Sequence, residues 1–191
     1  MPRPATDKRE RVVRAATEAV HARGFHSSTL ADIAKQAKVP VGSVYYFFKT
    51  KEQLGHAVIE AHVAHYDQRR ATWEELERPE ERLVAFLGMT LDNRQTLSRW
   101  GCPVATLTGE LQKEGGELGA EASKVFAGLL GWLSDQFRAL GSSEPEADAE
   151  HLLAAIEGAT LLTHSFHDPA YVERQVERLA AWIHRLAGST P

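Results

Sequence analysis

The chain has 191 residues, of which 43% are hydrophobic and 25% charged, a composition typical of a globular protein of one or two domains. No apolar run approaches the roughly 20 residues of a membrane span, and the N-terminal segment lacks the apolar stretch of a signal peptide. The single cysteine, Cys102, excludes a disulfide within the chain and is typical of a reducing compartment. We therefore expect a cytoplasmic protein with no membrane segment.

Charge is distributed unevenly along the chain. Residues 1–55 carry ten Lys and Arg against five Asp and Glu, a net charge of +5. The whole chain has a net charge of −4, which leaves −9 for residues 56–191. A basic N-terminal module on an acidic body indicates that one end alone binds a polyanion.

Helical periodicity covers nearly all of the chain. Apolar residues recur at helical spacing and Gly or Pro residues interrupt them, so the pattern predicts helices and no strand. In chain order, the expected helices span residues 7–23, 30–37, 41–47, 51–76, 80–93, 104–113, 118–140, 149–166 and 169–187. The predicted fold class is all-α, with about nine helices. The first three helices are too short to bury much core alone, so we expect them to pack on the long fourth helix.

The segment from Leu30 to Phe48 predicts a helix-turn-helix unit, with Lys38-Val39-Pro40 as the turn. Val44 and Phe48 lie four residues apart and should share one buried face. Tyr46 and, obliquely, Phe47 then point outward. In a helix-turn-helix unit the second helix enters the DNA major groove, where exposed rings have a partner.

Several side chains in this segment suit a DNA contact. Gly42 allows close backbone approach, Ser43 and Tyr46 can hydrogen-bond to phosphate or base edges, and Phe47 can meet a thymine methyl. Lys51 begins the next helix, where a docked phosphate would offset the unfavourable placement of a cation. Thr29 offers a similar contact at the start of the preceding helix. An N-terminal arm adds basic residues for the DNA backbone or minor groove, namely Arg3, Lys8, Arg9, Arg11 and Arg14.

These residues resemble the DNA-binding domain of the TetR (tetracycline repressor) family of bacterial regulators. The resemblance covers about residues 8–59. It rests on Thr29, Ile33, Ala34, Ala37, Val39, Gly42, Tyr45, Phe48, Lys51, Glu52 and Leu54, with Gly24-Phe25 upstream. Beyond residue 60 it is architectural only.

The resemblance implies a ligand-responsive transcriptional regulator, expected to be a repressor, whose dimer binds a palindromic operator and is released by a small-molecule inducer. A helix-turn-helix domain at 1–55 would be joined by the long helix to an all-helical ligand-binding and dimerisation domain at 56–191. By position, the expected DNA contacts are Thr29, Lys38, Val41, Gly42, Ser43, Tyr45, Tyr46, Phe47 and Lys51.

Three positions depart from the family pattern. Lys38 replaces the usual turn Gly and adds a charge that can reach phosphate. Pro40 replaces the usual capping Ser, and Phe47 replaces a common His or Tyr. These differences bear on base preference, and the expected binding mode is unchanged.

The last two expected helices carry long apolar faces. In the family, the equivalent helices form a four-helix bundle across a homodimer. The alternative is that the faces serve only the core of the chain itself. The expected interface residues are Leu152, Ile156, Ala159, Leu162, Phe166, Val172, Val176, Leu179 and Ile183.

The inducer is expected to bind among the middle helices, although each candidate residue also suits plain core packing. The candidates are His62, Tyr66, Phe86, Met89, Trp100, Cys102, Leu107, Phe126 and Trp132. The sequence does not identify the inducer, and it predicts no cofactor, metal site or catalytic residue.

Alternative functions remain open at this point. Cys102 lies at a helix break near Arg99, so it could sense electrophiles or oxidants, or act as the nucleophile of an enzyme. The pairs His62/His65 and His164/His167 raise a metal-sensing alternative. A helical interaction module would account for the helices, but not for the helix-turn-helix residues or the charge asymmetry. We therefore expect a DNA-binding regulator and not an enzyme.

Overall fold

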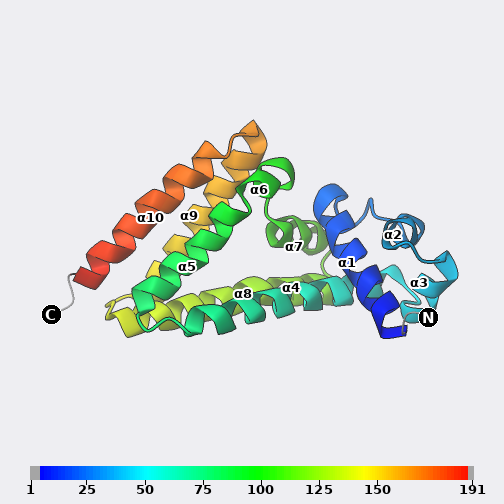
Figure 1. The fold of residues 1–191 in the computed structure, drawn as a ribbon, viewed down its shortest axis with the longest axis horizontal. Coiled ribbons are helices and arrows are strands. Elements are labelled where there is room, and N and C mark those ends of the chain that lie inside the picture. The colour runs from blue at the N-terminus through cyan, green and yellow to red at the C-terminus, as the bar shows by residue number, and fades with distance from the viewer. Residues whose placement is uncertain (1–4, 189–191) are drawn as a thin grey trace. The chain divides into compact units, whose positions relative to one another are not determined.

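The computed structural model describes residues 5–188, which contain α-helices and no strand (Figure 1), so the predicted all-α fold class is confirmed. The ten helices are α1 (Ala5–Arg23), α2 (Leu30–Ala37), α3 (Val41–Phe47), α4 (Lys51–Glu74), α5 (Pro79–Asp92), α6 (Arg94–Trp100), α7 (Pro103–Glu114), α8 (Gly116–Leu140), α9 (Pro145–Phe166) and α10 (Ala170–Gly188). None of the helices in these residues is both long and apolar enough to cross a membrane.

All nine expected helices are present, and α6 is an additional short helix. Asn93 separates it from α5, with backbone angles φ −96° and ψ 3°. The Asn93 side chain donates a hydrogen bond of 2.8 Å to the carbonyl of Met89, which closes the end of α5. Because this break contains no Gly or Pro, the sequence pattern gave no sign of it.

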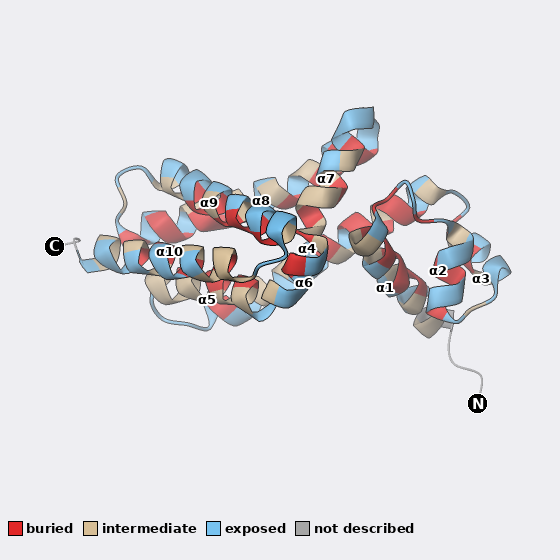
Figure 2. Cartoon of the chain, turned by 90° about the horizontal axis from the view of Figure 1, so that it is seen from above, coloured by how far each residue is buried: buried red, intermediate tan, exposed pale blue. Residues whose placement is uncertain are grey.

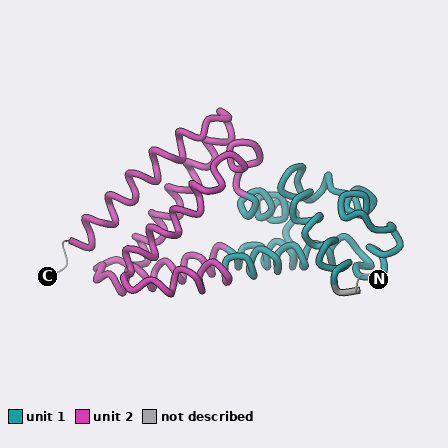
Figure 3. Tube along the Cα trace, viewed as in Figure 1, with its two compact units in different colours: residues 1–66, 103–125 teal, residues 67–102, 126–191 magenta. Residues whose placement is uncertain are grey.

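The chain divides into two compact units (Figure 3). Unit 1 comprises residues 1–66 and 103–125, and unit 2 comprises residues 67–102 and 126–191. The expected division lay at residue 55. In the structure the first part of α4, all of α7 and the start of α8 belong to the N-terminal unit, because α7 packs against α1.

The core of the helix-turn-helix unit forms where α1 packs against α2 and α3. Val12 and Ala16 of α1, Ile33 of α2 and Val44 of α3 are all buried, as is Phe48 directly after α3. Figure 2 shows the buried positions of α1 and α2 in red. The predicted inward face of Val44 and Phe48 is therefore confirmed. Burial of these two side chains determines which face of α3 remains outside.

Gly55 allows α4 to pack closely in unit 1. A Cβ atom at this position would lie 2.8 Å from Cδ2 of Leu118 and 3.0 Å from Cε2 of Phe25. A hydrogen bond of 2.5 Å between His56 Nδ1 and Glu121 Oε2 joins α4 to α8 beside it. Together these contacts hold the start of α4, which follows α3 directly.

The turn between α2 and α3 has an unusual conformation for its residue type. Lys38 ends α2 in the left-handed region, with φ 55° and ψ 47°. The Arg11 guanidinium of α1 donates hydrogen bonds of 2.5 Å to the carbonyl of Ala37 and 2.8 Å to that of Lys38. A cation at the C-terminal carbonyls of a helix is favourable, so Arg11 stabilises this turn.

Unit 2 packs α10 against α5 and α9, and α6 against α9. Trp73, Phe86 and Trp132 form an aromatic cluster within it. The centroid of the Trp73 ring lies 5.7 Å from that of Phe86 and 5.2 Å from that of Trp132. Trp132 Nε1 donates a hydrogen bond of 3.1 Å to Glu74 Oε1, which satisfies the polar end of the ring.

The expected dimer interface requires a correction. Seven of its nine residues are buried within the chain itself, because the longest apolar stripes of α9 and α10 pack on each other and α10 packs on α5. These seven are Leu152, Ile156, Ala159, Val172, Val176, Leu179 and Ile183. Leu162 and Phe166 are the two that remain exposed.

We predict that Arg11→Gln lowers the free energy of unfolding by about 1–2 kcal/mol, because it removes charge-assisted hydrogen bonds to the end of α2. Urea denaturation followed by circular dichroism measures this change. Arg14→Gln, an exposed residue of the same helix, is the matched control. Equal stability losses in the two variants would show that the Arg11 contacts contribute nothing specific.

Candidate DNA-binding surface

The outer face of α3 consists of apolar and aromatic side chains with few contacts. Val41 is 43% exposed, Tyr45 49% and Tyr46 71%. Gly42 is also exposed, and a Cβ atom added there would meet nothing within 4 Å. Tyr45, one of the expected DNA contacts, therefore lies on the same exposed face. Such a face, held by a buried helix-turn-helix core, has the form of a recognition helix.

The rings of Tyr46 and Phe47 support each other. They meet edge to face, with centroids 5.1 Å apart. The Lys49 ammonium lies 5.9 Å from the centroid of the Tyr46 ring. This pairing limits the freedom of an exposed ring, so the Tyr46 hydroxyl is held in a narrower range of positions than an isolated side chain would allow.

Thr29 is the N-cap of α2. Its Oγ1 accepts a hydrogen bond of 3.1 Å from the Asp32 backbone N–H, and its hydroxyl donates one of 2.6 Å to Asp32 Oδ2. The hydrogen bond from the Thr29 hydroxyl lowers the pKa of Asp32, with smaller contributions from Arg23 and Lys35. A phosphate contact at Thr29 must therefore share this hydroxyl with a carboxylate.

Lys51 lies in the first turn of α4, as expected, but it already has partners in the chain. Its ammonium donates a hydrogen bond of 2.8 Å to the carbonyl of His26 and lies 4.9 Å from the centroid of the Phe25 ring. Thr50 caps the helix by accepting a hydrogen bond from the Gln53 backbone N–H. Lys51 thus connects the loop after α1 with the start of α4.

Two of the N-terminal basic residues have partners within the chain. Arg11 binds the end of α2, and the Arg9 guanidinium lies 5.4 Å from the centroid of the Phe48 ring. Lys38, by contrast, is exposed at the turn beside α3. Arg3 lies outside the described residues. The sequence pattern did not reveal the structural role of Arg11, because its partners are backbone carbonyls 26 and 27 residues away.

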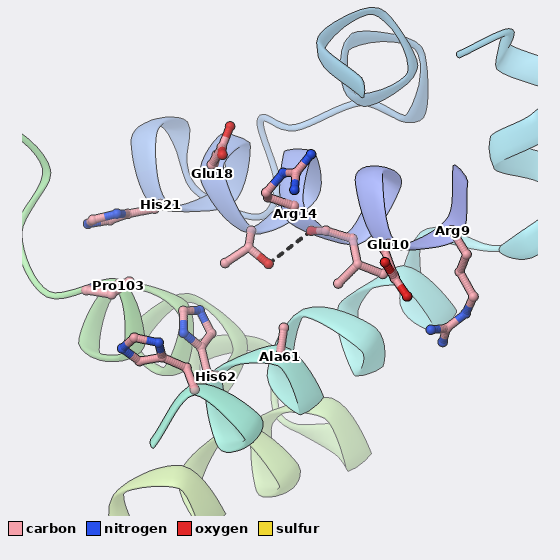
Figure 4. Close-up of a pocket in the computed structure, with 11 residues that line it drawn as sticks. Arg9, Glu10, Arg14, Glu18, His21, Ala61, His62 and Pro103 are labelled. Atoms are coloured by element: carbon pink, nitrogen blue, oxygen red, sulfur yellow. Dashed lines mark hydrogen bonds between the residues drawn. The ribbon is translucent and has the colours of Figure 1, made fainter. Parts of the chain in front are cut away.

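The nine expected inducer-binding residues are divided between the units. His62, Tyr66 and Leu107 belong to unit 1, and the other six belong to unit 2. Phe86 and Trp132 lie in the aromatic cluster of unit 2, whereas His62 lines a pocket of unit 1 between α1 and α4 (Figure 4). The α1 side of that pocket, which includes His21, was not predicted. A histidine of α1 gives no periodic signal that pairs it with a histidine of α4.

Cys102 is half-buried and has an acidic neighbour. Burial raises the pKa of Glu157, and a hydrogen bond with the Cys102 side chain opposes that shift. Cys102 thus shares a hydrogen bond with a buried carboxyl group, and the sensor and nucleophile alternatives stay predictions. Nearby, the Nδ1 atoms of His164 and His167 lie 3.2 and 3.1 Å from the carbonyl oxygen of Ser98. The second histidine pair is therefore turned toward one backbone acceptor.

A groove of about 460 Å³ crosses the outside of α9 and α10. Gly158, Leu162 and Tyr171 are among the residues that line it, along with Arg174 and Arg178. At one end the Phe166 and Tyr171 rings stack, with centroids 5.3 Å apart. Leu161 and Phe166 are 64% and 62% exposed on α9. Two of the nine predicted interface residues, Leu162 and Phe166, thus lie on this exposed apolar face, and Leu161 adds to it.

Two family models match the chain. Residues 12–58 match the model described as bacterial regulatory proteins of the tetR family, and residues 79–178 match the C-terminal domain of LmrA/YxaF-like transcriptional regulators. The HTH-type transcriptional repressor NemR of Escherichia coli (strain K12) is 31% identical over 135 residues, which is 67% of this chain and 66% of NemR. The match thus spans just under two thirds of that relative. The transcriptional regulator AcuR of Cereibacter sphaeroides is 30% identical over 170 residues, which is 86% of this chain and 75% of AcuR.

Solved structures agree with these matches. The regulatory protein TetR from Rhodobacter sphaeroides is 25% identical with a TM-score of 0.80, and the match covers 91% of this chain and 97% of that one. The reduced form of E. coli NemR is 26% identical with a TM-score of 0.80, covering 91% and 95%. The outer face of α3, the helix-turn-helix core and both family models lead to one conclusion: the chain belongs to the TetR family of bacterial transcriptional regulators.

Proposed function

We propose that the chain is a ligand-responsive transcriptional repressor that binds a palindromic operator as a homodimer and leaves it when a small molecule binds. The observation that carries the proposal is the outer face of α3, where Tyr46 is 71% exposed beside an unobstructed Gly42. In this arrangement α3 lies in the major groove, and the Gly42 backbone approaches the DNA closely. Val41, Tyr45 and Phe47 meet base edges and thymine methyls, and Ser43 and Tyr46 donate to phosphates or bases.

Lys38 and Lys51 would contribute differently to this complex. Lys38 is exposed at the turn and can approach a phosphate without losing another contact. Lys51 must exchange or share its hydrogen bond to the His26 carbonyl. Thr29 adds the N-terminal end of α2, where backbone N–H groups favour an anion. We therefore expect Lys38 to add more to the electrostatic attraction for DNA than Lys51 does.

The homodimer would form through the outer face of α9 and α10. Leu161, Leu162 and Phe166 present apolar area there, and Gly158 allows close approach of a second helix pair. A twofold axis through this face would bring identical residues together, as in an isologous interface. Dimerisation matters for function because it sets the spacing of the two α3 helices on the operator.

We predict that Lys38→Gly weakens operator binding and decreases the slope of log Kd against log salt by about 0.9 for each half-site, the value for one lost phosphate contact. Glycine suits the left-handed conformation at this position, so the variant should fold at least as well as the parent chain. Fluorescence anisotropy with a labelled operator between about 50 and 200 mM salt measures the slope. Lys124→Ala, an exposed residue of α8, is the control, and an unchanged slope for Lys38→Gly would remove Lys38 from the interface.

We also predict that Tyr46→Ala reduces operator affinity at least tenfold, about 1.4 kcal/mol, without lowering the melting temperature, because the ring is exposed. Thermal unfolding and anisotropy on the same preparation test both parts. Binding as tight as that of the parent chain would contradict the placement of α3 in the groove.

For the dimer, Leu162→Glu is expected to give a species with the mass of one chain in size-exclusion chromatography with light scattering, since it places a charge in the apolar face. Leu76→Glu, an exposed leucine after α4, should leave the mass unchanged. The Leu162→Glu chain should bind a single half-site only weakly. A dimer that persists in this variant would show that the interface lies elsewhere on the chain.

A further inference from the structure

Unit 1 contains a pocket of about 500 Å³ that lies between α1 and α4 (Figure 4). One wall is a single face of α1, from which Glu10, Val13, Thr17 and His21 recur at helical spacing. The other wall comes from α4, and Pro103 at the start of α7 closes one end. Pockets of this volume accommodate small organic molecules. The pocket lies wholly within the unit that carries the helix-turn-helix.

Histidines from both walls gather at one end of the pocket. His62 is buried, whereas His21 is half-buried and His65 exposed. Burial, with smaller contributions from His21 and His65, lowers the pKa of His62 to about 4. The His62 ring is therefore neutral near pH 7, although it has two further imidazoles close enough to oppose its charge. An anion bound at this end would offset part of the cost of burial and of this repulsion, because it favours the protonated form of every ring it approaches.

The remaining charges of the lining balance one another. The lining contains two carboxylates, Glu10 and Glu18, and two guanidinium groups, Arg9 and Arg14, so their charges sum to zero. Figure 4 shows Arg14 and Glu18 on the side of α1 that faces away from His62, and Glu10 and Arg9 toward the end opposite His21. The groups that can still gain a positive charge are therefore the histidines at one end of the pocket. The middle of the pocket is apolar and is lined by Val13 and Ala61.

A metal ion is a poor match for these histidines. No group of three or more His, Cys, Asp or Glu side chains in the described part of the chain is placed to hold one. A structural or catalytic zinc ion requires three or four such ligands at about 2.0–2.3 Å. Imidazoles that are close but not convergent suit hydrogen bonds to a larger anionic group.

We propose that this pocket binds a small organic monocarboxylate with an apolar body, its carboxylate at His21, His62 and His65 and its body along Val13 and Ala61. The site lies in the DNA-binding unit and goes beyond the proposed operator function, since it requires neither DNA nor a dimer. Binding takes up protons, because a carboxylate raises the pKa of the imidazoles that it contacts. Affinity therefore rises as pH falls, by at most about tenfold per pH unit for each proton taken up.

Sodium octanoate is a suitable probe, with octanol and octylammonium as neutral and cationic analogues of equal chain length. Histidine ring resonances of the full chain, observed by NMR, should shift on titration with octanoate and move toward the protonated position. Octanol and octylammonium should leave them unchanged. Calorimetry in buffers of different ionisation enthalpy should show proton uptake, and octanoate affinity should increase as the pH falls below neutrality, in the range above the His62 pKa of about 4.

Two matched substitutions locate the site. Ala61→Phe fills the middle of the pocket and should abolish the octanoate response, whereas Ala64→Phe, exposed on the same helix, should retain it. His62→Gln keeps a polar side chain of similar length and should reduce affinity and proton uptake together. Circular dichroism confirms that each variant is folded.

Three outcomes would overturn the proposal. They are octanoate binding that persists in Ala61→Phe, equal binding of octanol, and a response of the histidine resonances to Zn²⁺ but not to octanoate. None of these depends on operator binding. Failure here would leave the proposed regulator intact, and loss of DNA binding by Tyr46→Ala would say nothing against the pocket.

Discussion

Burial of Val44 and Phe48 against α1 and α2 is the constraint on which the DNA-binding surface depends. Helix α3 has only seven residues and no side-chain N-cap, so it has little stability of its own. Its orientation comes from these two buried side chains, which leave Val41, Gly42 and Tyr46 outside. Four consecutive aromatic residues therefore serve two purposes: Phe48 anchors the helix, and the others cover its outer face to different extents.

Helix α1 supports this arrangement from three directions. It contributes Val12 and Ala16 to the core, and through Arg11 it holds the carbonyls at the end of α2. Its opposite face forms the wall of the histidine-lined pocket. A change in the position of α1 relative to α4 would thus be felt both at the turn before α3 and in that pocket. A ligand bound in the pocket would contact the same helix that supports α2 and α3.

The sequence was sufficient for the parts of the structure that follow local rules. Periodicity located nine of the ten helices in the described residues, and the four-residue spacing of Val44 and Phe48 predicted their shared burial. It was insufficient where partners are distant in sequence. Arg11 looked like a DNA-contacting cation, yet it binds carbonyls near residue 38. Likewise, the apolar stripes of α9 and α10 could serve a core or an interface. The packing of α9 on α10, and of α10 on α5, shows that Leu152 and Val172 are interior and that Leu161 and Phe166 are not.

Lys38 gives the turn a property that a glycine would not provide. A side chain in the left-handed region costs about 1 kcal/mol relative to glycine, a noticeable share of the 5–15 kcal/mol by which domains are stable. In return, the turn carries a cation that does not belong to the base-reading face of α3. In the proposed complex, sequence preference and overall affinity would therefore be set by different residues. Substitutions at Lys38 would then change how tightly the operator is bound without changing which operator is recognised.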